Sequence, residues 1–244
     1  MTVSADAVDV SIVIPVYNEE GILSAALADL TEKLSDVDWT YEILVAENGS
    51  TDATVEIATQ FSERHPEVQV FSTGEPNYGK ALKTGILKAR GTYVICDEID
   101  LCDTAFYHVA LAQLRHGGFD FVVGSKRAKG ARDRRPGYRR AATTVLNGML
   151  KVATGFQGTD THGLKAFRRD SVLPVVEACV VDKDMFASEL VVRVHRDESL
   201  RWTEVPIDLV EKRPPSIHLF KRVPNVLRNM VRLTAIIRFG RDLK

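Results

Sequence analysis

Strands and helices are expected to alternate strictly over the first hundred residues, and this alternation constrains the fold more than any other feature. Each expected strand is a short apolar run, and a run that is apolar on both faces is typical of a buried parallel strand. The alternation therefore predicts an α/β fold with a mostly parallel, Rossmann-like sheet flanked by helices. The first expected strand starts at residue 10 and ends in a turn at residues 15–18, the next strands lie at 41–46, 68–71 and 93–96, and the helices lie at 22–34, 55–64 and 80–90.

The pattern is looser after residue 119. A strand at residues 119–125 leads into a basic, glycine-bearing loop at residues 126–135. Pro214 and Pro215 require extended or turn geometry near the end of the chain. Further helices are expected at residues 139–153, 184–196 and 221–244, and further strands near residues 158–167 and 202–209.

Composition narrows the class of protein. The chain has 244 residues, of which 45% are hydrophobic, so it can bury the core of one large domain or two small ones. Its net charge of -1 gives no reason to expect a nucleic-acid partner. Cys96, Cys102 and Cys179 form no CxxC pair, which suits a reducing cytoplasm. The sequence shows neither a signal-peptide pattern nor a run of about 18 apolar residues, so we expect any membrane contact to be peripheral.

A cluster of carboxylates follows the expected strand at residues 93–96. Its members are Asp97, Glu98, Asp100 and Asp103. Carboxylates this close together repel one another and lose hydration when buried, so the cluster favours a bound divalent cation. The alternative is a helix N-terminus, where acidic side chains interact favourably with the helix dipole. We expect Asp103 to serve as the cap of the helix that follows.

Polar loops follow three of the expected strands, at residues 15–19, 47–52 and 97–100. In open α/β sheets, ligands bind beyond the carboxyl ends of the parallel strands. The loops are therefore expected to converge on one crevice. The helix after residue 52 is expected to be capped by Ser50, Thr51 or Asp52.

Motifs in a fixed order then give the chain a resemblance to a known family. They read IPVYNE at residues 14–19, ENGSTD at 47–52, NYGKA at 77–81, EIDL at 98–101, and VPI at 205–207 followed by EKR at 211–213. With these motifs the chain resembles the family 2 glycosyltransferases of the GT-A fold, and among them it is most similar to the dolichyl- or polyprenyl-phosphate mannose (or glucose) synthases.

The resemblance implies a nucleotide site and a metal site. Glu98 and Asp100 fall on the family's Asp-x-Asp motif, which holds Mg²⁺ or Mn²⁺ against the donor diphosphate. Glu98 is one methylene longer than the usual Asp, and Cys102 stands where a Gln can add a metal contact, so Asp97 or Asp103 is a candidate to compensate as an oxygen ligand. The implied nucleotide-binding residues are Pro15, Tyr17, Glu19, Glu47, Ser50, Asp52, Lys80, Asp97 and Glu98.

Glycosyl transfer from a nucleotide sugar releases a diphosphate, so the site must stabilise negative charge on the leaving group. A divalent cation does this as a Lewis acid, and Lys or Arg side chains do it as fixed charges. Lys126, Arg139 and Arg213 are the candidates for binding the phosphate of the donor or of the acceptor. The alternative for each is a solvated surface charge.

The acceptor decides whether a general base is needed. A hydroxyl acceptor loses a proton during attack and requires a base, whereas a phosphate acceptor, with a second pKa of about 6, is already ionised. Asp182 and Asp184 are candidate bases, although Asp184 is as well placed to cap a helix. Glu189 is spaced like a Glu of lipid-phosphate synthases that orients a loop through Arg or Lys. His162 is either an acceptor-site residue or a packed turn residue.

The C-terminal segment interleaves basic and apolar residues over positions 218–244. A basic amphipathic helix of this kind suits an anionic membrane surface. The alternative is a helix that packs on the catalytic domain with its charges in water, and both can hold in part.

The sequence thus predicts metal-dependent transfer of a hexose from GDP-mannose or UDP-glucose to a polyprenyl or dolichyl phosphate, with inversion, at the cytoplasmic face of a membrane. The alternatives are transfer to a soluble or polysaccharide hydroxyl, and a sugar-nucleotide-binding protein with impaired catalysis. We expect one GT-A domain at residues 1–217, with a nucleotide-binding half at about 8–104, an acceptor half at about 105–217, and a separate helix at 218–244.

Overall fold

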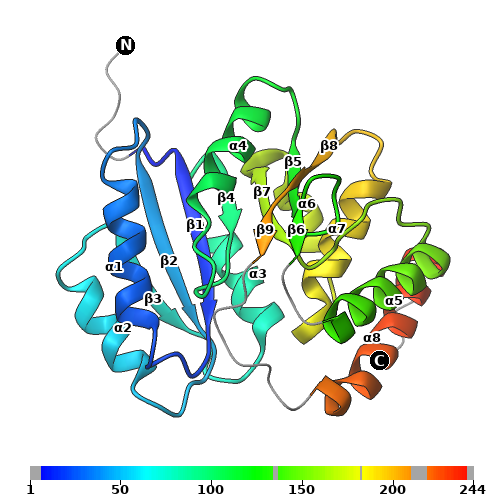
Figure 1. Cartoon of the computed structure of the whole chain (residues 1–244), viewed down its shortest axis with the longest axis horizontal. Coiled ribbons are helices and arrows are strands. Elements are labelled where there is room, and N and C mark those ends of the chain that lie inside the picture. The colour runs from blue at the N-terminus through cyan, green and yellow to red at the C-terminus, as the bar shows by residue number, and fades with distance from the viewer. Residues whose placement is uncertain (1–6, 134–136, 182, 210–218, 241–244) are drawn as a thin grey trace.

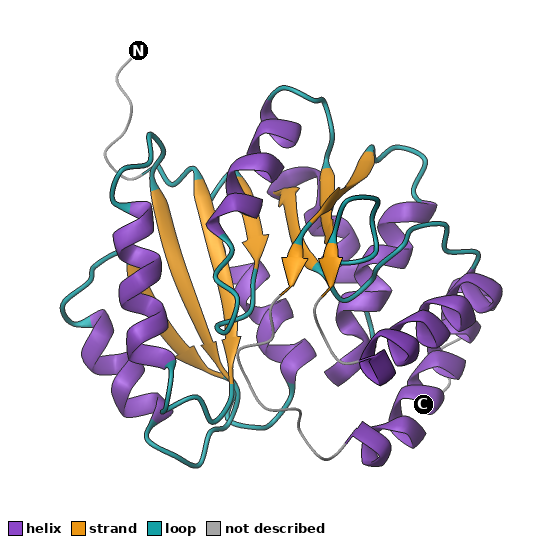
Figure 2. Ribbon diagram, in the orientation of Figure 1, coloured by secondary structure: helices purple, strands orange, loops and turns teal. Residues whose placement is uncertain are grey.

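The computed structural model describes residues 7–133, 137–181, 183–209 and 219–240. Within these residues, seven strands form one sheet in the order β3-β2-β1-β4-β7-β5-β8, with helices on both of its faces (Figures 1 and 2). The strands β1 to β4 run parallel, β7 runs antiparallel to both of its neighbours, and β8 is parallel to β5. The prediction of a mostly parallel α/β sheet is confirmed.

The first half of the chain alternates as expected. Its elements are β1 Val10–Val16, α1 Leu23–Leu34, β2 Tyr41–Glu47, α2 Thr54–Ser62, β3 Val68–Ser72, α3 Tyr78–Lys88, β4 Tyr93–Cys96 and α4 Thr104–Arg115. The elements of the second half are β5 Phe121–Ser125, β6 Arg132–Asp133, α5 Gly137–Thr154, β7 Leu164–Arg168, α6 Arg169–Ala178, the 3₁₀ turn η1 Lys183–Met185, α7 Phe186–Arg196, β8 Trp202–Pro206, β9 Asp208–Leu209 and α8 Leu219–Phe239.

Several expectations need correction. The helix α6 was not expected, because Pro174 lies inside it and β-branched valines surround the proline, and both features disfavour helix. The helix expected from residue 184 begins instead with the 3₁₀ turn η1. The strand expected at residues 202–209 is divided into β8 and β9, and β9 pairs with β6 in a separate two-stranded sheet. The expected boundary at residues 217 and 218 lies outside the described residues.

Two large apolar clusters hold the sheet between its helices. Ile12 of β1 packs in the cluster on one face, together with residues of α1, α2 and α4. Val13, the next residue, packs in the cluster on the other face with residues of α3, α6 and α7. This alternation is the period of two that a strand buried on both faces requires. A smaller cluster joins Leu150 of α5, Met185 of η1 and Leu233 of α8.

The imidazole of His195 of α7 lies between two aromatic rings, with both ring nitrogens buried. Its ring centroid lies 4.7 Å from that of Phe156 and 3.4 Å from that of Trp202. Neither ring nitrogen has a hydrogen-bond partner among the described residues. Burial lowers the pKa of His195 to about 4, so the folded protein holds this histidine neutral.

His195 should therefore make the folded state sensitive to acid. Between the unfolded pKa of about 6.5 and the folded pKa, the unfolded chain binds more protons, so stability falls as the pH decreases through that window. We expect His195→Phe to flatten the decline of Tm between about pH 7 and pH 4, measured by differential scanning calorimetry. His108→Gln, at an exposed histidine of α4, is the control and should leave the decline unchanged. Equal declines in the parent and in His195→Phe would show that His195 does not cause the effect.

Candidate functional site

The loops after β1 and β2 are bound to each other by reciprocal hydrogen bonds. The Asn18 N–H donates to Ser50 Oγ at 3.0 Å, and the Thr51 N–H donates to Asn18 Oδ1 at 2.8 Å. The Glu20 N–H donates to Asp52 at 3.2 Å. Asp52 also accepts the N–H of Thr54, the first residue of α2, at 3.0 Å. Ser50 and Asp52 therefore fix the loops at the carboxyl edge of the sheet.

Glu47, at the end of β2, is buried inside its own loop. Its carboxylate accepts hydrogen bonds from the Ser50 N–H and, at 2.5 Å, from the Ser72 hydroxyl of β3. The next turn is equally tight, because Gly49 has φ +80° and a Cβ there would lie 2.8 Å from the backbone of Glu75. This geometry gives Glu47 a positioning role, with its oxygens directed into the loop.

The other residues expected to border the nucleotide differ in exposure. Pro15 is buried in β1 opposite Ala46, and Tyr17 just beyond it is 41% exposed. Glu19 is buried, and its N–H donates to Thr54 Oγ1 at 2.7 Å. Lys80 of α3 is exposed, with its ammonium 2.6 Å from Glu75. Tyr17 therefore presents an exposed aromatic ring at the end of β1.

The cluster after β4 separates into acids with different environments. Asp97 is buried and accepts from the Glu98 N–H at 2.6 Å, the Asp103 N–H at 3.1 Å and the Tyr107 hydroxyl at 2.5 Å. Burial raises the pKa of Asp97 to about 7. Asp103 accepts the N–H of Phe106 at 3.1 Å, so its predicted role as the cap of α4 is confirmed. Both side chains therefore shape this loop through hydrogen bonds to its backbone.

Glu98 and Asp100 remain partly exposed at the end of β4. The Tyr78 hydroxyl donates to Glu98 Oε1 at 2.9 Å. Burial raises the pKa of Glu98, and the charge of Asp100 adds to the rise. Tyr78 and the cations Lys165 and Lys126 act in the opposite direction. Glu98 and its partners therefore form one electrostatic cluster.

This pair of carboxylates fits a hard divalent cation. Mg²⁺ and Mn²⁺ prefer oxygen ligands, and one or two carboxylates suffice when phosphate and water complete the coordination. Among the described residues, no group of three or more His, Cys, Asp or Glu side chains could hold a metal. The donor set is therefore suited to a cation that arrives with a phosphate ligand.

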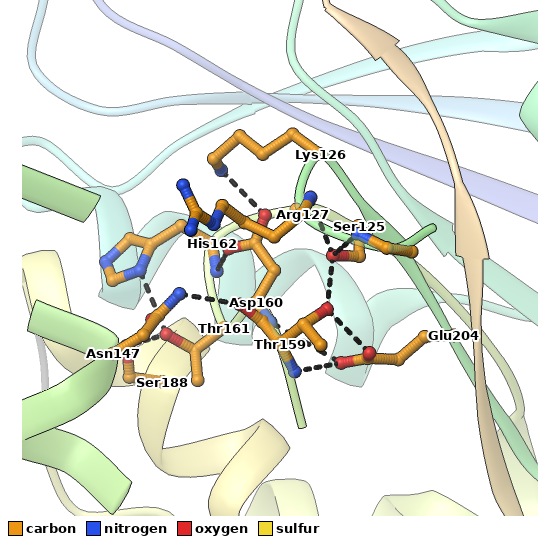
Figure 3. Close-up of polar contacts among 12 residues, drawn as sticks. Ser125, Lys126, Arg127, Asn147, Thr159, Asp160, Thr161, His162, Ser188 and Glu204 are labelled. Atoms are coloured by element: carbon orange, nitrogen blue, oxygen red, sulfur yellow. Dashed lines mark hydrogen bonds and ion pairs between the residues drawn. The ribbon is translucent and has the colours of Figure 1, made fainter. Parts of the chain in front are cut away.

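A buried ion pair joins the end of β5 to the turn before β7 (Figure 3). The Lys126 ammonium, directly after β5, is 2.9 Å from Asp160 Oδ2, and both side chains are buried. Burial alone would raise the pKa of Asp160, but the charge of Lys126 and the N–H of His162 outweigh it and lower the pKa. The His162 side chain is exposed, with Nδ1 3.0 Å from Thr161 Oγ1. Sequence reasoning singled out Lys126 but did not identify Asp160 as its partner.

Glu204 of β8 holds this turn in place (Figure 3). Its carboxylate accepts from the Thr159 N–H at 2.7 Å and from the Thr159 hydroxyl at 2.6 Å. Thr159 Oγ1 lies 2.7 Å from Ser125 Oγ, which in turn accepts the N–H of Arg127 at 3.1 Å. Glu204 had no motif to identify it, since only the fold brings β8 next to the turn before β7.

Lys165 is a second buried cation that sequence reasoning missed. It lies on β7 opposite Cys96, and its ammonium donates to the Gly163 carbonyl at 2.6 Å. Burial lowers the pKa of Lys165, while the neighbouring Cys96, Asp160 and Glu98 oppose that shift. The available signal was a lysine among the apolar residues Leu164, Ala166 and Phe167.

The remaining candidates fall into two groups. Glu189 of α7 is fully buried. Its carboxylate accepts hydrogen bonds from the N–H groups of Val180 at 3.0 Å and Val181 at 2.6 Å, and from Arg193 Nε at 2.8 Å. These contacts position the loop before η1. The structure describes neither Asp182 nor Arg213. It describes the backbone of Arg139 and Asp184 but not their side chains. Their predicted roles stay predictions.

Comparison with known proteins places this site in a family. Residues 11–175 match the family model for glycosyl transferase family 2. The chain belongs to that family. An undecaprenyl-phosphate 4-deoxy-4-formamido-L-arabinose transferase of Serratia proteamaculans is 32% identical over 164 residues, which cover 66% of this chain and 49% of that protein. A dolichyl-phosphate beta-glucosyltransferase of Trichomonas vaginalis is 30% identical over 220 residues, which cover 80% of this chain and 66% of that protein.

The family 2 chain thus spans about half the length of the undecaprenyl-phosphate transferases that it matches. Solved structures support the fold. Mannosyl-3-phosphoglycerate synthase from Rubrobacter xylanophilus has a TM-score of 0.69 at 17% identity, covering 97% of this chain and 77% of that one. Glucosyl-3-phosphoglycerate synthase from Mycobacterium tuberculosis, in complex with Mn²⁺, UDP-glucose and phosphoglyceric acid, has a TM-score of 0.68 at 20% identity, covering 95% and 82%. The predicted GT-A fold is confirmed.

The buried Lys126–Asp160 pair should contribute measurably to the free energy of unfolding. Removing one member of a buried ion pair leaves the other uncompensated, so Lys126→Met and Asp160→Asn should each lower the free energy of unfolding by about 3–5 kcal/mol. The double variant should recover part of that loss. Urea denaturation of all four proteins measures the coupling.

The exposed pair Lys33–Asp29 of α1 is the control, with its charged atoms at 2.7 Å. The same cycle there should give a coupling energy below about 1 kcal/mol. A coupling at Lys126–Asp160 no larger than this would contradict the assignment of a buried pair.

Proposed function

We propose that this chain is a glycosyltransferase domain that transfers a hexose from a nucleotide sugar to a polyprenyl phosphate. The observation that carries the proposal is that Glu98 and Asp100 are partly exposed at the end of β4, and that the charges of Asp100 and of the buried cations Lys126 and Lys165 all act on Glu98. Such a site can bind a cation and a diphosphate together. The named relatives act on undecaprenyl and dolichyl phosphates, which supports this class of acceptor.

In this proposal the donor half of the site neutralises the leaving diphosphate. Mg²⁺ or Mn²⁺ held by Glu98 and Asp100 would supply Lewis-acid stabilisation of that charge. Tyr78 holds the carboxylate of Glu98 in place through its hydroxyl. Tyr17 offers an exposed aromatic ring at the end of β1 for the nucleotide. GDP-mannose and UDP-glucose are the candidate donors.

A phosphate acceptor agrees with the environment of the acidic residues on the acceptor side. A phosphate needs no general base, because it is already ionised at neutral pH. Glu189 and Glu204 are each engaged by backbone N–H groups, and Asp160 is engaged by Lys126. Lys126 places a positive charge where an anionic acceptor would approach. Transfer to a hydroxyl, with Asp182 or Asp184 as base, is the alternative, and so is a binding protein without turnover.

We further propose that α5 and α8 meet an anionic bilayer on its cytoplasmic side. These helices pack side by side at the end of the molecule away from α1 and α2 (Figure 1). One side of α8 is buried through Met230 and Leu233, in a cluster with Leu150 of α5. Packing on the domain therefore accounts for one face of this helix.

Next to this buried side, α8 also carries apolar side chains that are exposed. Leu227, Val231 and Phe239 are 44%, 61% and 71% exposed, and Val152 of α5 is 80% exposed. Between the two helices lies an apolar groove of about 830 Å³ that includes Leu227, Val231 and Phe239. Arg228, Lys151 and Arg140 are exposed on the same helices, and such cations favour anionic lipid. Among the described residues, no helix combines the length and the apolar character needed to cross a bilayer.

Turnover assays test the proposed reaction. With Mn²⁺, a nucleotide sugar and polyprenyl phosphate, the parent should release nucleoside diphosphate, and Asp100→Ala should lower the rate by about 10²–10³-fold because the metal loses a ligand. Glu63→Ala, at an exposed acid beyond α2, should match the parent. Turnover only with hydroxyl acceptors would contradict the lipid assignment, and nucleotide binding with no turnover would favour the binding protein.

Vesicle flotation tests the membrane surface. The full chain should bind vesicles containing anionic phosphatidylglycerol more tightly than neutral phosphatidylcholine vesicles. Val231→Glu should weaken binding by about tenfold or more, since a buried apolar side chain of this size contributes about 1.5–3 kcal/mol. Val55→Glu is the control, because Val55 of α2 is 42% exposed at the other end of the molecule. Equal binding of parent and Val231→Glu would exclude this surface.

A further inference from the structure

The first turn of α3 lies between the donor carboxylates and the acceptor side of the site. Asn77 caps this helix, since its Oδ1 accepts the Lys80 N–H at 3.0 Å. The same oxygen accepts the Lys183 N–H of η1 at 2.9 Å. The next residue, Tyr78, donates its hydroxyl to Glu98 at 2.9 Å. Two adjacent residues therefore bind distant parts of the chain: Asn77 binds Lys183, 106 positions away, and Tyr78 binds Glu98, 20 positions away.

Backbone packing makes this junction rigid. A Cβ on Gly79 would lie 2.6 Å from the Lys183 carbonyl oxygen and 2.7 Å from its nitrogen, so only glycine allows the turn to touch η1. Lys183 itself has φ +51°, a left-handed conformation that a lysine keeps only when its surroundings impose it. The hydrogen bond from the Lys183 N–H to Asn77 is one such restraint.

Other contacts hold η1 and the residues just before it, 179–181. Glu189 accepts the N–H groups of Val180 and Val181, and Lys83 of α3 donates to the Cys179 carbonyl at 2.6 Å. Met185 of η1 is buried against Leu233 of α8. A continuous set of contacts therefore leads from Glu98 through Tyr78 and Asn77 to η1, and from η1 to α8.

We propose that Asn77 and Tyr78 are positioning residues that join the two halves of the site, Tyr78 by fixing the metal ligand Glu98 and Asn77 by fixing η1. This inference rests on the proposed glycosyl transfer for the meaning of the two halves. Residues that orient a metal ligand through a hydrogen bond typically change metal affinity by about 10–100-fold when removed. The two residues should therefore have separable effects, one on the donor and one on the acceptor side.

Tyr78→Phe tests the donor side, because it removes one hydroxyl and keeps the ring. Calorimetry with Mn²⁺ and a nucleoside diphosphate should show affinity weakened by about 10–100-fold, with Tm close to that of the parent. Tyr138→Phe, at an exposed tyrosine of α5, is the matched control and should bind like the parent. Equal affinity in Tyr78→Phe and the parent would overturn this half of the inference.

Asn77→Ala tests the acceptor side through hydrogen exchange of the full chain without ligands. Backbone amides of Val181 and of η1 should exchange about tenfold faster or more, because the Lys183 N–H loses its acceptor. Asn77→Asp keeps an oxygen acceptor at the same position and should restore most of the protection. Unchanged exchange in Asn77→Ala would overturn this half.

Steady-state kinetics tests whether the two residues act on different substrates. Tyr78→Phe should raise KM for the donor more than KM for the acceptor, and Asn77→Ala should do the reverse. Identical changes in both constants would indicate general loss of structure and contradict the assignment. A parent that binds Mn²⁺ and nucleotide but transfers no sugar would instead refute the proposed function, while the calorimetric and exchange results would still decide the positioning roles.

Discussion

The antiparallel course of β7 between β4 and β5 is the constraint on which the site depends. A parallel strand brings only its carboxyl end to the binding edge of a sheet, whereas an antiparallel strand brings its amino end and the turn before it. Pairing of Cys96 with Lys165 therefore delivers the turn that carries Asp160 to the side of Lys126. Gly163 is required at this crossing, because a Cβ there would lie 1.8 Å from the Gly124 carbonyl oxygen.

The antiparallel pairing of β7 with β4 also brings the ammonium of Lys165 near the carboxylate of Glu98, and both groups lose hydration there. Burial raises the pKa of Glu98 and lowers that of Lys165, so it drives both groups toward their neutral forms. A divalent cation would favour ionised Glu98, and a diphosphate would favour protonated Lys165. A ligand that carries both charges relieves both penalties at once, so this cluster suits a metal–diphosphate complex better than it suits either component alone.

Local patterns in the sequence predicted most of the sheet, but not the direction of every side chain at its edge. Apolar runs located the strands of the first half, since each is buried on both faces. Nothing in the motif at residues 97–103 shows that Asp97 binds the Tyr107 hydroxyl in the interior while Glu98 binds the Tyr78 hydroxyl and stays partly exposed. Glu204 could not be found either, because its partner Thr159 is 45 positions away and becomes a neighbour only through the sheet order.

The C-terminal helix packs on the domain and still leaves apolar side chains exposed. Its periodicity indicated either packing on the domain or contact with a membrane, and the structure assigns different faces of α8 to burial and to exposure. The buried side of α8 packs against Met185 of η1. The helix therefore contacts the same turn that Asn77 holds through the Lys183 N–H. In the proposed membrane arrangement, a lipid-linked acceptor would approach along the helix whose buried side contacts η1, the turn that Asn77 holds next to α3. For the proposed transfer from a nucleotide sugar to a lipid-linked acceptor, a junction that fixes both halves of the site would reduce the entropy lost when the two reacting groups are aligned.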